Sequence, residues 1–283
     1  MDHVQFYNGV KMPCLGFGVY HLTEEGQCER AVTEALQAGY RMIDTAAFYG
    51  NEKAVGAAVR KSGIPREEIF ITSKLWVSDI SYEGAKKAFP RTLSLLGLEY
   101  LDLYLIHQPF NDYYGAWRAL EEFYEEGKIR AIGVSNFYPD RLIDLTAHNQ
   151  ISPMVNQLEV NPFYQRHEEQ KIMEEMNIKI EAWSPLAAGK DNLFTNPVLL
   201  SIGKKYGKTA AQVTLRWLVQ RGIVPLPRSS NAQRIQQNCQ IFDFSLTEED
   251  MKQIASLDTG KSCFYSHRDP AAVRRLTSMK LES

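Results

Sequence analysis

Short apolar runs alternate with longer amphipathic stretches along the whole chain. A short apolar run bounded by glycine or polar residues is typical of a buried strand, whereas apolar residues three and four positions apart predict a helix. Eight such runs predict strands, within residues 15–19, 40–44, 69–74, 101–107, 129–135, 154–157, 178–183 and 224–226. The amphipathic stretches predict helices near residues 26–38, 53–62, 82–96, 114–126, 140–148, 167–176, 209–221 and 231–239, with a further segment at 247–257.

The order of these elements indicates the fold class. Strict alternation of strand and helix predicts a parallel sheet, and eight units in 283 residues suit an α/β fold of the (β/α)8 TIM barrel type better than an open sheet. No linker or low-complexity tract divides the chain, so we expect one barrel domain over residues 1–283. Residues 4–13 alternate around Asn8-Gly9, a dipeptide typical of a β-hairpin, which we expect to cap the N-terminal end of the barrel.

Composition and charge exclude several classes of protein. The chain is 44% apolar and 23% charged, which is ordinary for a globular protein with a large core. Its net charge of −2 and pI of about 6.3 give no reason to expect nucleic acid or a membrane surface as partner. No apolar run approaches the roughly 18 residues of a membrane helix, and the first residues lack a signal pattern. We therefore expect a cytoplasmic protein, and a monomer because no extra interface element stands out.

Two common kinds of ligand motif are missing. The four cysteines, at positions 14, 28, 239 and 263, are scattered, so we expect free thiols and no metal site. Gly16-Phe17-Gly18 lacks the third glycine that opens a helix in the Rossmann fingerprint, and no P-loop sequence occurs. A bound phosphate would therefore need another kind of site.

Ionisable side chains follow three consecutive predicted strands. Asp44 and Tyr49 come after the second strand, Lys74 ends the third and His107 ends the fourth. Because the carboxyl ends of parallel strands meet at one edge, we expect these side chains to share a site. A neighbouring ammonium favours the phenolate form of tyrosine and lowers its pKa, and an imidazole can orient a carbonyl oxygen. The set suits protonation of a carbonyl oxygen while a nucleophile such as hydride attacks the carbon.

With these residues, the chain resembles the aldo-keto reductase family over nearly its whole length. It resembles in particular bacterial members of the diketogluconate and glyoxal reductase type. Residues 44–52 look like the family's catalytic signature, residues 71–76 like its lysine strand and residues 105–107 like its histidine strand. The resemblance implies a (β/α)8 barrel that reduces aldehydes and ketones with a nicotinamide cofactor. It implies that Tyr49 is the general acid, that Lys74 lowers its pKa, that Asp44 pairs with Lys74 and that His107 orients the carbonyl.

The resemblance also implies where the nicotinamide would lie. Ser135, Asn136 and Gln157 match positions that hydrogen-bond the carboxamide, and Trp183 stands where the family usually has a tyrosine that stacks on the ring. Further residues that we expect along the cofactor are Gly18, Val19, Asp44, Ser184 and Leu186.

A basic loop follows the eighth predicted strand, just before a helix. Short hydroxyl side chains, two arginines and a helix N-terminus together can bind phosphate, and the end of strands seven and eight is the usual phosphate site of a barrel. The resemblance implies that this loop holds the 2′-phosphate of NADPH (NADP+), with Arg228 in place of the usual lysine. The residues that we expect there are Arg228, Ser229, Ser230, Asn231, Arg234 and Asn238.

Aromatic residues just past the strand ends predict a small carbonyl substrate. We expect the pocket to be lined by Tyr20, Tyr49, Trp76, His107 and Phe110. The family often has tryptophan after the histidine, but Gln108 stands there, which indicates a more polar substrate. Residues 263–270 resemble the family's C-terminal segment and could fold over the opening.

Two other functions remain open on the sequence. Lys74 at a barrel rim could form a Schiff base, as in an aldolase. Alternatively, the chain could be a cofactor-binding regulatory subunit in which turnover is incidental. Each of the four ionisable residues could also be structural when taken alone, for instance as a salt bridge at a strand end.

Overall fold

The computed structural model describes residues 2–281. Ten strands and eleven α-helices occur in this part of the chain. The strands are β1 (His3–Gln5), β2 (Lys11–Pro13), β3 (Phe17–Gly18), β4 (Met42–Asp44), β5 (Phe70–Leu75), β6 (Leu103–Ile106), β7 (Ile132–Ser135), β8 (Val155–Glu159), β9 (Lys179–Trp183) and β10 (Val224–Pro225). The helices are α1 (Gln27–Gln37), α2 (Glu52–Lys61), α3 (Tyr82–Leu96), α4 (Tyr113–Glu125), α5 (Pro139–Ala147), α6 (His167–Glu175), α7 (Pro197–Tyr206), α8 (Ala210–Gln220), α9 (Ala232–Cys239), α10 (Glu248–Ala255) and α11 (Pro270–Ser278).

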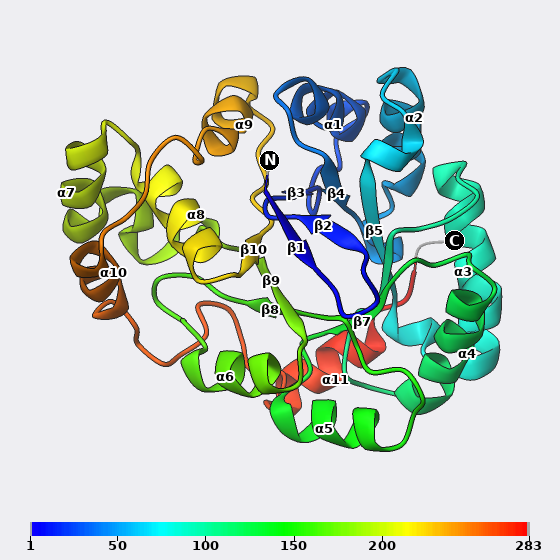
Figure 1. Ribbon diagram of the computed structural model, residues 1–283. Helices are drawn as coiled ribbons and strands as arrows, with labels where there is room; N and C mark the ends of the chain where they lie inside the picture. Colours follow the sequence, from blue (N-terminus) through cyan, green and yellow to red (C-terminus); the bar gives the residue numbers. More distant parts are fainter. Residues whose placement is uncertain (1, 282–283) are drawn as a thin grey trace.

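The strands β3 to β10 form one parallel sheet in chain order. Backbone hydrogen bonds also join its two edges, because Gly16 N–H donates to Pro225 O (3.1 Å) and Gly18 N–H donates to Pro227 O (3.0 Å). The sheet therefore closes on itself, and in Figure 1 the helices surround the ring of strands. This confirms the predicted (β/α)8 barrel.

Two glycines allow the two edges of the sheet to approach. A Cβ atom at Gly16 would lie 2.5 Å from Leu226 Cδ2, and one at Gly18 would lie 3.3 Å from the backbone oxygen of Leu226. Contacts this short are tighter than ordinary packing, so a larger side chain would push the edges apart. Gly18, expected beside the cofactor, thus lies in the closing seam of the barrel, opposite Asp44 in the strand register.

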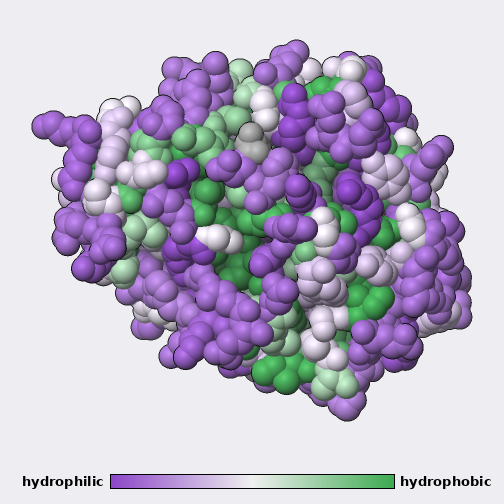
Figure 2. All heavy atoms as spheres, viewed as in Figure 1, coloured by the Kyte–Doolittle hydropathy of each residue, from purple (hydrophilic) through white to green (hydrophobic). Residues whose placement is uncertain are grey.

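The predicted hairpin is confirmed as the antiparallel pair β1–β2, which crosses the centre of the ring in Figure 1. Phe6 and Met12 pack into the barrel against Met42, Phe70 and Leu103. The hairpin therefore closes the N-terminal end of the barrel with apolar side chains. On this face the outer helices present mostly hydrophilic side chains (Figure 2), and no helix within residues 2–281 is long and apolar enough to cross a membrane.

The side chains inside the barrel change character along the strands. Strand residues alternate between the helices and the barrel interior, so Ile43 and Ile71 pack against helices whereas Met42 and Phe70 point inward. Two residues further along, the inward positions become polar, as at Asp44 and Thr72. The N-terminal half of the interior is thus an apolar core, and the C-terminal half carries the ionisable groups.

All eight predicted barrel strands and nine predicted helices are present, with ends shifted by a few residues. The pattern missed α7 and α11. Both begin with proline at the first turn behind a capping side chain, Asn196 or Asp269, which are valid start signals. Both helices lie outside the strict alternation of strand and helix, so the pattern alone did not predict them.

Candidate active site

Lys74 is the centre of the ionisable cluster. It points into the barrel from β5 and is fully buried, and its Nζ donates to Asp44 Oδ1 (2.6 Å), Thr45 O (2.8 Å) and Tyr49 Oη (3.4 Å). A buried ammonium is tolerated only when it is paired and hydrogen-bonded, and all three of its protons have acceptors here. The structure therefore brings Asp44, Lys74 and Tyr49 together, as the sequence predicts.

A short 3-10 turn (Ala47–Tyr49) carries the phenol of Tyr49. The turn ends at Gly50, whose φ of 67° is left-handed and suits glycine. The side chain of Asn51, a residue not singled out from the sequence, holds the turn in place. It accepts a hydrogen bond from Thr45 Oγ1 (2.7 Å) and donates one to Val19 O (3.0 Å). The backbone of this turn thus sets the distance between the Asp44 carboxylate and the Tyr49 phenol.

The proton state of Tyr49 follows from its surroundings. Burial, helped by the Asp44 carboxylate, raises the pKa of Tyr49 well above its usual value, so the phenol is protonated at neutral pH. The Lys74 ammonium opposes this effect, since a cation 3.4 Å away favours phenolate. The expectation that Lys74 lowers the pKa of Tyr49 stays a prediction.

His107 lies beside the phenol at the end of β6. Its ring centroid is 5.7 Å from that of Tyr49 and 5.0 Å from that of Trp76, edge to face in both cases. Burial and the Lys74 ammonium hold the pKa of His107 well below its usual value, so the imidazole is neutral. Its Nδ1 has no hydrogen-bond partner within residues 2–281. A neutral imidazole keeps one ring N–H, which can donate a hydrogen bond to a ligand oxygen.

The residues expected around the nicotinamide also meet at this rim. Asn136 donates to Ser135 Oγ (3.1 Å) and accepts from Trp183 Nε1 (2.8 Å), so Trp183 uses its indole N–H to fix Asn136. Gln157 lies inside the barrel, and its Nε2 donates to Asp44 Oδ2 (3.0 Å). Val19 N–H donates to Asp44 O (3.1 Å), which places Val19 at the same edge. Ser184 begins the loop after β9 in a left-handed conformation (φ 46°).

A separate cleft of about 470 Å³ lies beyond this rim. It is lined by Leu186, Phe194, Leu200, Thr209, Ala210, Ala211, Arg228, Ser229, Arg234, Gln237 and Asn238. Four of the six residues expected at the phosphate therefore share one cleft, while Ser230 and Asn231 lie exposed on the loop between them.

The lining of this cleft fits an adenine nucleotide with a further phosphate. The start of α8 (Thr209, Ala210 and Ala211) lines the cleft, and a helix N-terminus favours an anion. From α9, which begins behind Asn231, Arg234 and Asn238 line it. Arg228 and Arg234 add two exposed guanidinium groups to a chain whose net charge is negative. Phe194 and Leu200 are about half exposed (49% and 47%) and offer apolar surface for a base. Neither residue was expected here from the sequence, because neither follows a predicted strand.

Aromatic side chains ring the entrance beside Tyr49. Tyr20 lies 4.8 Å from Tyr49 between ring centroids, and Phe48, which the sequence analysis did not expect there, stacks on Trp76 at 3.9 Å. Phe110 stacks on His267 at 6.4 Å. Gln108 is buried, and its Oε1 has no partner in the described chain.

The C-terminal segment completes this entrance. Trp76 Nε1 donates to Met279 O (2.9 Å), which ties the segment after α11 to the end of β5. Tyr265 packs on His267 at 5.0 Å, and burial raises the pKa of Tyr265. The sequence analysis expected this segment at the opening but did not identify Tyr265 or His267 as part of the wall.

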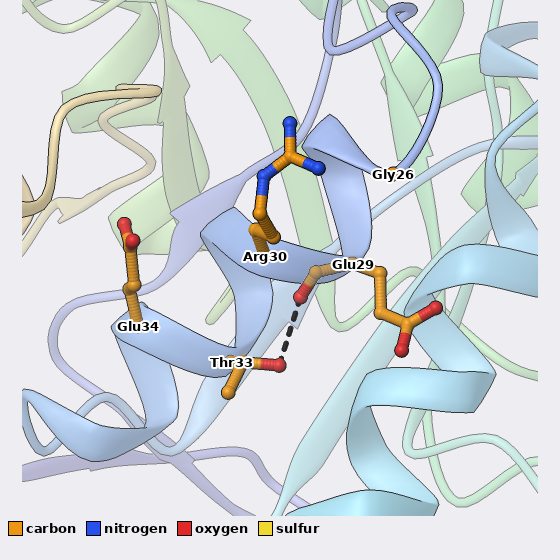
Figure 3. Close-up of a pocket in the computed structure, with 5 residues that line it drawn as sticks. All are labelled: Gly26, Glu29, Arg30, Thr33 and Glu34. Atoms are coloured by element: carbon orange, nitrogen blue, oxygen red, sulfur yellow. Dashed lines mark hydrogen bonds between the residues drawn. The ribbon is translucent and has the colours of Figure 1, made fainter.

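A shallow groove on α1 is not part of the site. It has a volume of about 370 Å³ and is lined by Gly26, Glu29, Arg30, Thr33 and Glu34. In Figure 3 the side chains of Arg30 and Glu34 extend in the same direction, Glu29 points away from both, and the Thr33 hydroxyl bonds back to the backbone of Glu29 (2.9 Å). Nothing in it resembles a paired acid and base.

The comparisons with known proteins agree with this geometry. A sequence profile described as the Aldo/keto reductase family matches residues 14–259. A 9,11-endoperoxide prostaglandin H2 reductase of Trypanosoma cruzi is 48% identical over 260 residues, 91% of this chain and 92% of that protein. A glyoxal reductase of Bacillus subtilis is 47% identical over 258 residues, 91% and 93% of the two chains.

A solved structure shows the same fold. The Bombyx mori aldo-keto reductase in complex with NADP superposes with a TM-score of 0.88 at 32% identity, covering 96% of each chain. The region matched by the family profile contains Asp44, Tyr49, Lys74 and His107 but ends before Tyr265 and His267. The C-terminal wall of the entrance thus lies outside that match.

Proposed function

This chain belongs to the aldo/keto reductase family, and from this premise we propose that Tyr49 is the proton donor in the reduction of an aldehyde or ketone to an alcohol. The enzyme is an NADPH-dependent carbonyl reductase. When bound, the reduced nicotinamide supplies the hydride that adds to the carbonyl carbon. The proposal rests chiefly on one observation, the contact of Lys74 Nζ with both Asp44 and Tyr49 inside the barrel.

The protein's own groups handle the oxygen of the carbonyl. The neutral imidazole of His107 donates a hydrogen bond to that oxygen and so holds it next to Tyr49 Oη. Tyr49 gives its proton to the oxygen as negative charge develops there. The Lys74 ammonium, 3.4 Å away, stabilises the phenolate that remains, and Asp44 keeps Lys74 charged. Asp44, Lys74 and His107 are buried and Tyr49 is partly buried, so little water reaches the ion pair and the interactions there are strengthened.

Other residues would position the cofactor. Ser135, Asn136 and Gln157 offer polar atoms for a carboxamide at the rim, and Trp183 offers an aromatic face. The cleft beside α9 would take the adenosine end, with Arg228 and Arg234 on its 2′-phosphate. The aromatic entrance would admit a small carbonyl compound.

An aldolase role for Lys74 has little support. A Schiff base requires a neutral amine that can reach the substrate. Lys74 instead has all its protons engaged and lies behind the phenol. Measurable turnover would likewise argue against a purely regulatory subunit.

Further properties belong to the proposal. The chain acts as a single barrel domain over residues 1–283 and as a monomer, with no nucleic acid partner, which agrees with its net charge of −2. Its four cysteines are unpaired, which is typical of the reducing cytoplasm.

Loss of reduced-cofactor absorbance with a panel of aldehydes and ketones tests the activity. We expect Tyr49→Phe to lower kcat at least about 100-fold, the usual size for loss of a general acid, while NADPH binding followed by fluorescence is kept. Full activity of Tyr49→Phe would exclude Tyr49 as the proton donor.

A further inference from the structure

Glu181 is a buried carboxyl group that the proposed reaction does not use. It lies on β9 and points into the barrel, directly opposite Gln157 on β8 and Val224 on β10 in the strand register. The residue is fully buried. Its Oε2 accepts from Gln157 Nε2 (2.7 Å), and its Oε1 has no hydrogen-bond partner within residues 2–281.

The amide of Gln157 is shared between two carboxyl groups. Its Nε2 donates to Glu181 Oε2 (2.7 Å) and to Asp44 Oδ2 (3.0 Å), so one proton of the amide serves each acid. The other oxygen of Asp44 accepts from Lys74 (2.6 Å), which in turn contacts Tyr49 (3.4 Å). A continuous chain of hydrogen bonds therefore joins Glu181 to the phenol.

The charges along this chain of hydrogen bonds do not balance if every group in it ionises. Lys74 is the one cation in it, and Asp44 already neutralises it. Gln157 is neutral, and the neighbours Val224, on β10, and Leu226, just after it, are apolar. An additional unpaired charge in a buried site is costly, so the favourable state is the one in which Glu181 keeps its proton.

Other ionisable groups in the barrel do not change this balance. The carboxyl group of Glu159, the next inward residue of β8, accepts hydrogen bonds from Ser262 Oγ (2.5 Å) and Cys263 N–H (2.9 Å). His107 is neutral, as described above. In agreement with the geometry, burial and the Asp44 carboxylate raise the pKa of Glu181 from 4.5 to about 8.

We propose that Glu181 is a positioning residue: as a neutral acid it fixes Gln157 beside Asp44, and its ionisation places a second negative charge behind the Asp44–Lys74 pair. This inference rests on the proposed role of Tyr49. The added charge holds the proton of Tyr49 more tightly, which keeps the donor protonated in alkaline solution. Glu181 thereby extends the pH range of reduction and disfavours the reverse reaction, which needs the phenolate.

The first experiment does not involve the cofactor. Glu181→Gln keeps an acceptor for Gln157 but cannot ionise. The pKa of Glu181 is higher in the folded protein than in the unfolded chain, so the proton on Glu181 stabilises the fold. This contribution is fully present below pH 4.5 and is lost as the pH rises to about 8. Relative to Glu181→Gln, the unfolding equilibrium constant of the wild type should therefore rise by up to a factor of ten per pH unit across that window. Urea denaturation of both proteins at several pH values measures this difference.

A second experiment follows the coupling to Tyr49. The alkaline limb of kcat for carbonyl reduction should move to lower pH by about one unit in Glu181→Gln, the size expected for one charge several ångström away at an effective dielectric constant of about 20. Glu121→Gln is the matched control, because Glu121 is a buried glutamate outside the barrel that accepts from Ile151 N–H (2.8 Å). It should leave the limb in place.

The outcomes separate this inference from the proposed function. Equal pH dependence of stability in wild type and Glu181→Gln would show that Glu181 holds no proton and overturn the inference. A changed stability profile with an unmoved alkaline limb would overturn the coupling to Tyr49. Full activity of Tyr49→Phe would instead refute the proposed function, and the stability result would still report on the proton of Glu181.

Discussion

The ammonium of Lys74 lies 2.6 Å from the carboxylate of Asp44 in a place that water does not reach. An ion pair of this kind contributes little net stability, because desolvation offsets much of the attraction between the charges. Removing one partner is different, since the other charge is then buried alone. The Asp44–Lys74 pair therefore serves to hold a cation next to Tyr49, and loss of either partner destabilises the fold.

Lys74→Met should impair both catalysis and folding. We expect kcat to fall at least about 100-fold, because the phenolate loses its cation, and the free energy of unfolding to fall by about 3 to 5 kcal/mol, because Asp44 remains unpaired. Urea denaturation and the reductase assay measure the two effects. Lys128→Met is the control, since Lys128 pairs with Glu126 at the surface and should matter little. A Lys74→Met protein as stable as the wild type would contradict the account of the pair.

Arg234→Ala should discriminate between the two nicotinamide cofactors. Arg234 lines the cleft at the start of α9, where a 2′-phosphate would be held by its guanidinium. A charge-assisted hydrogen bond of about 1.5 to 3 kcal/mol corresponds to a rise of roughly 10- to 150-fold in KM for NADPH. KM for NADH should hardly change. Arg216→Ala, on α8 and bonded to Ser245 (2.9 Å), is the control. Equal effects of Arg234→Ala on both cofactors would place the phosphate elsewhere.

His267 should make the protein sensitive to acid. Burial lowers the pKa of His267 from 6.5 to about 4, so between these values the unfolded chain binds a proton that the folded chain does not. The stability contribution is fully present above pH 6.5 and is lost as the pH falls to about 4.

His267→Phe removes this titration and keeps an aromatic ring against Phe110 and Tyr265. Between pH 6.5 and 4.5 the variant should lose less stability than the wild type, by up to about 1.4 kcal/mol per pH unit. Urea denaturation at pH 7, 6 and 5 gives the slopes. His148→Phe, at an exposed site beside Asp144, is the matched control and should keep the wild-type slope. The same slope in His267→Phe and wild type would mean that His267 is not neutral in the fold.

Local sequence pattern determined the barrel and the catalytic cluster. The alternation of apolar runs with amphipathic stretches predicted eight strands, and residues two apart in a strand face the same side. Once Met42 and Phe70 point into the barrel, Asp44, Thr72 and Lys74 must do so as well. The meeting of Asp44, Tyr49, Lys74 and His107 was therefore predictable from positions near the ends of consecutive strands.

The tertiary structure alone decided which distant residues complete the site. Gln157 reaches Asp44 from 113 residues away and Trp76 reaches Met279 from 203 residues away. No local pattern encodes such pairs, because a loop of unknown path separates them. The same reason explains why Phe194 was missed, and why the contacts of Tyr265 and His267 could not be read from the C-terminal segment that was expected at the opening. It also explains why the shared amide between Asp44 and Glu181 appears only when the strands close into a ring. Periodicity fixes the face on which a side chain lies, whereas its proton state and partners depend on the packing of chain segments far apart in the sequence.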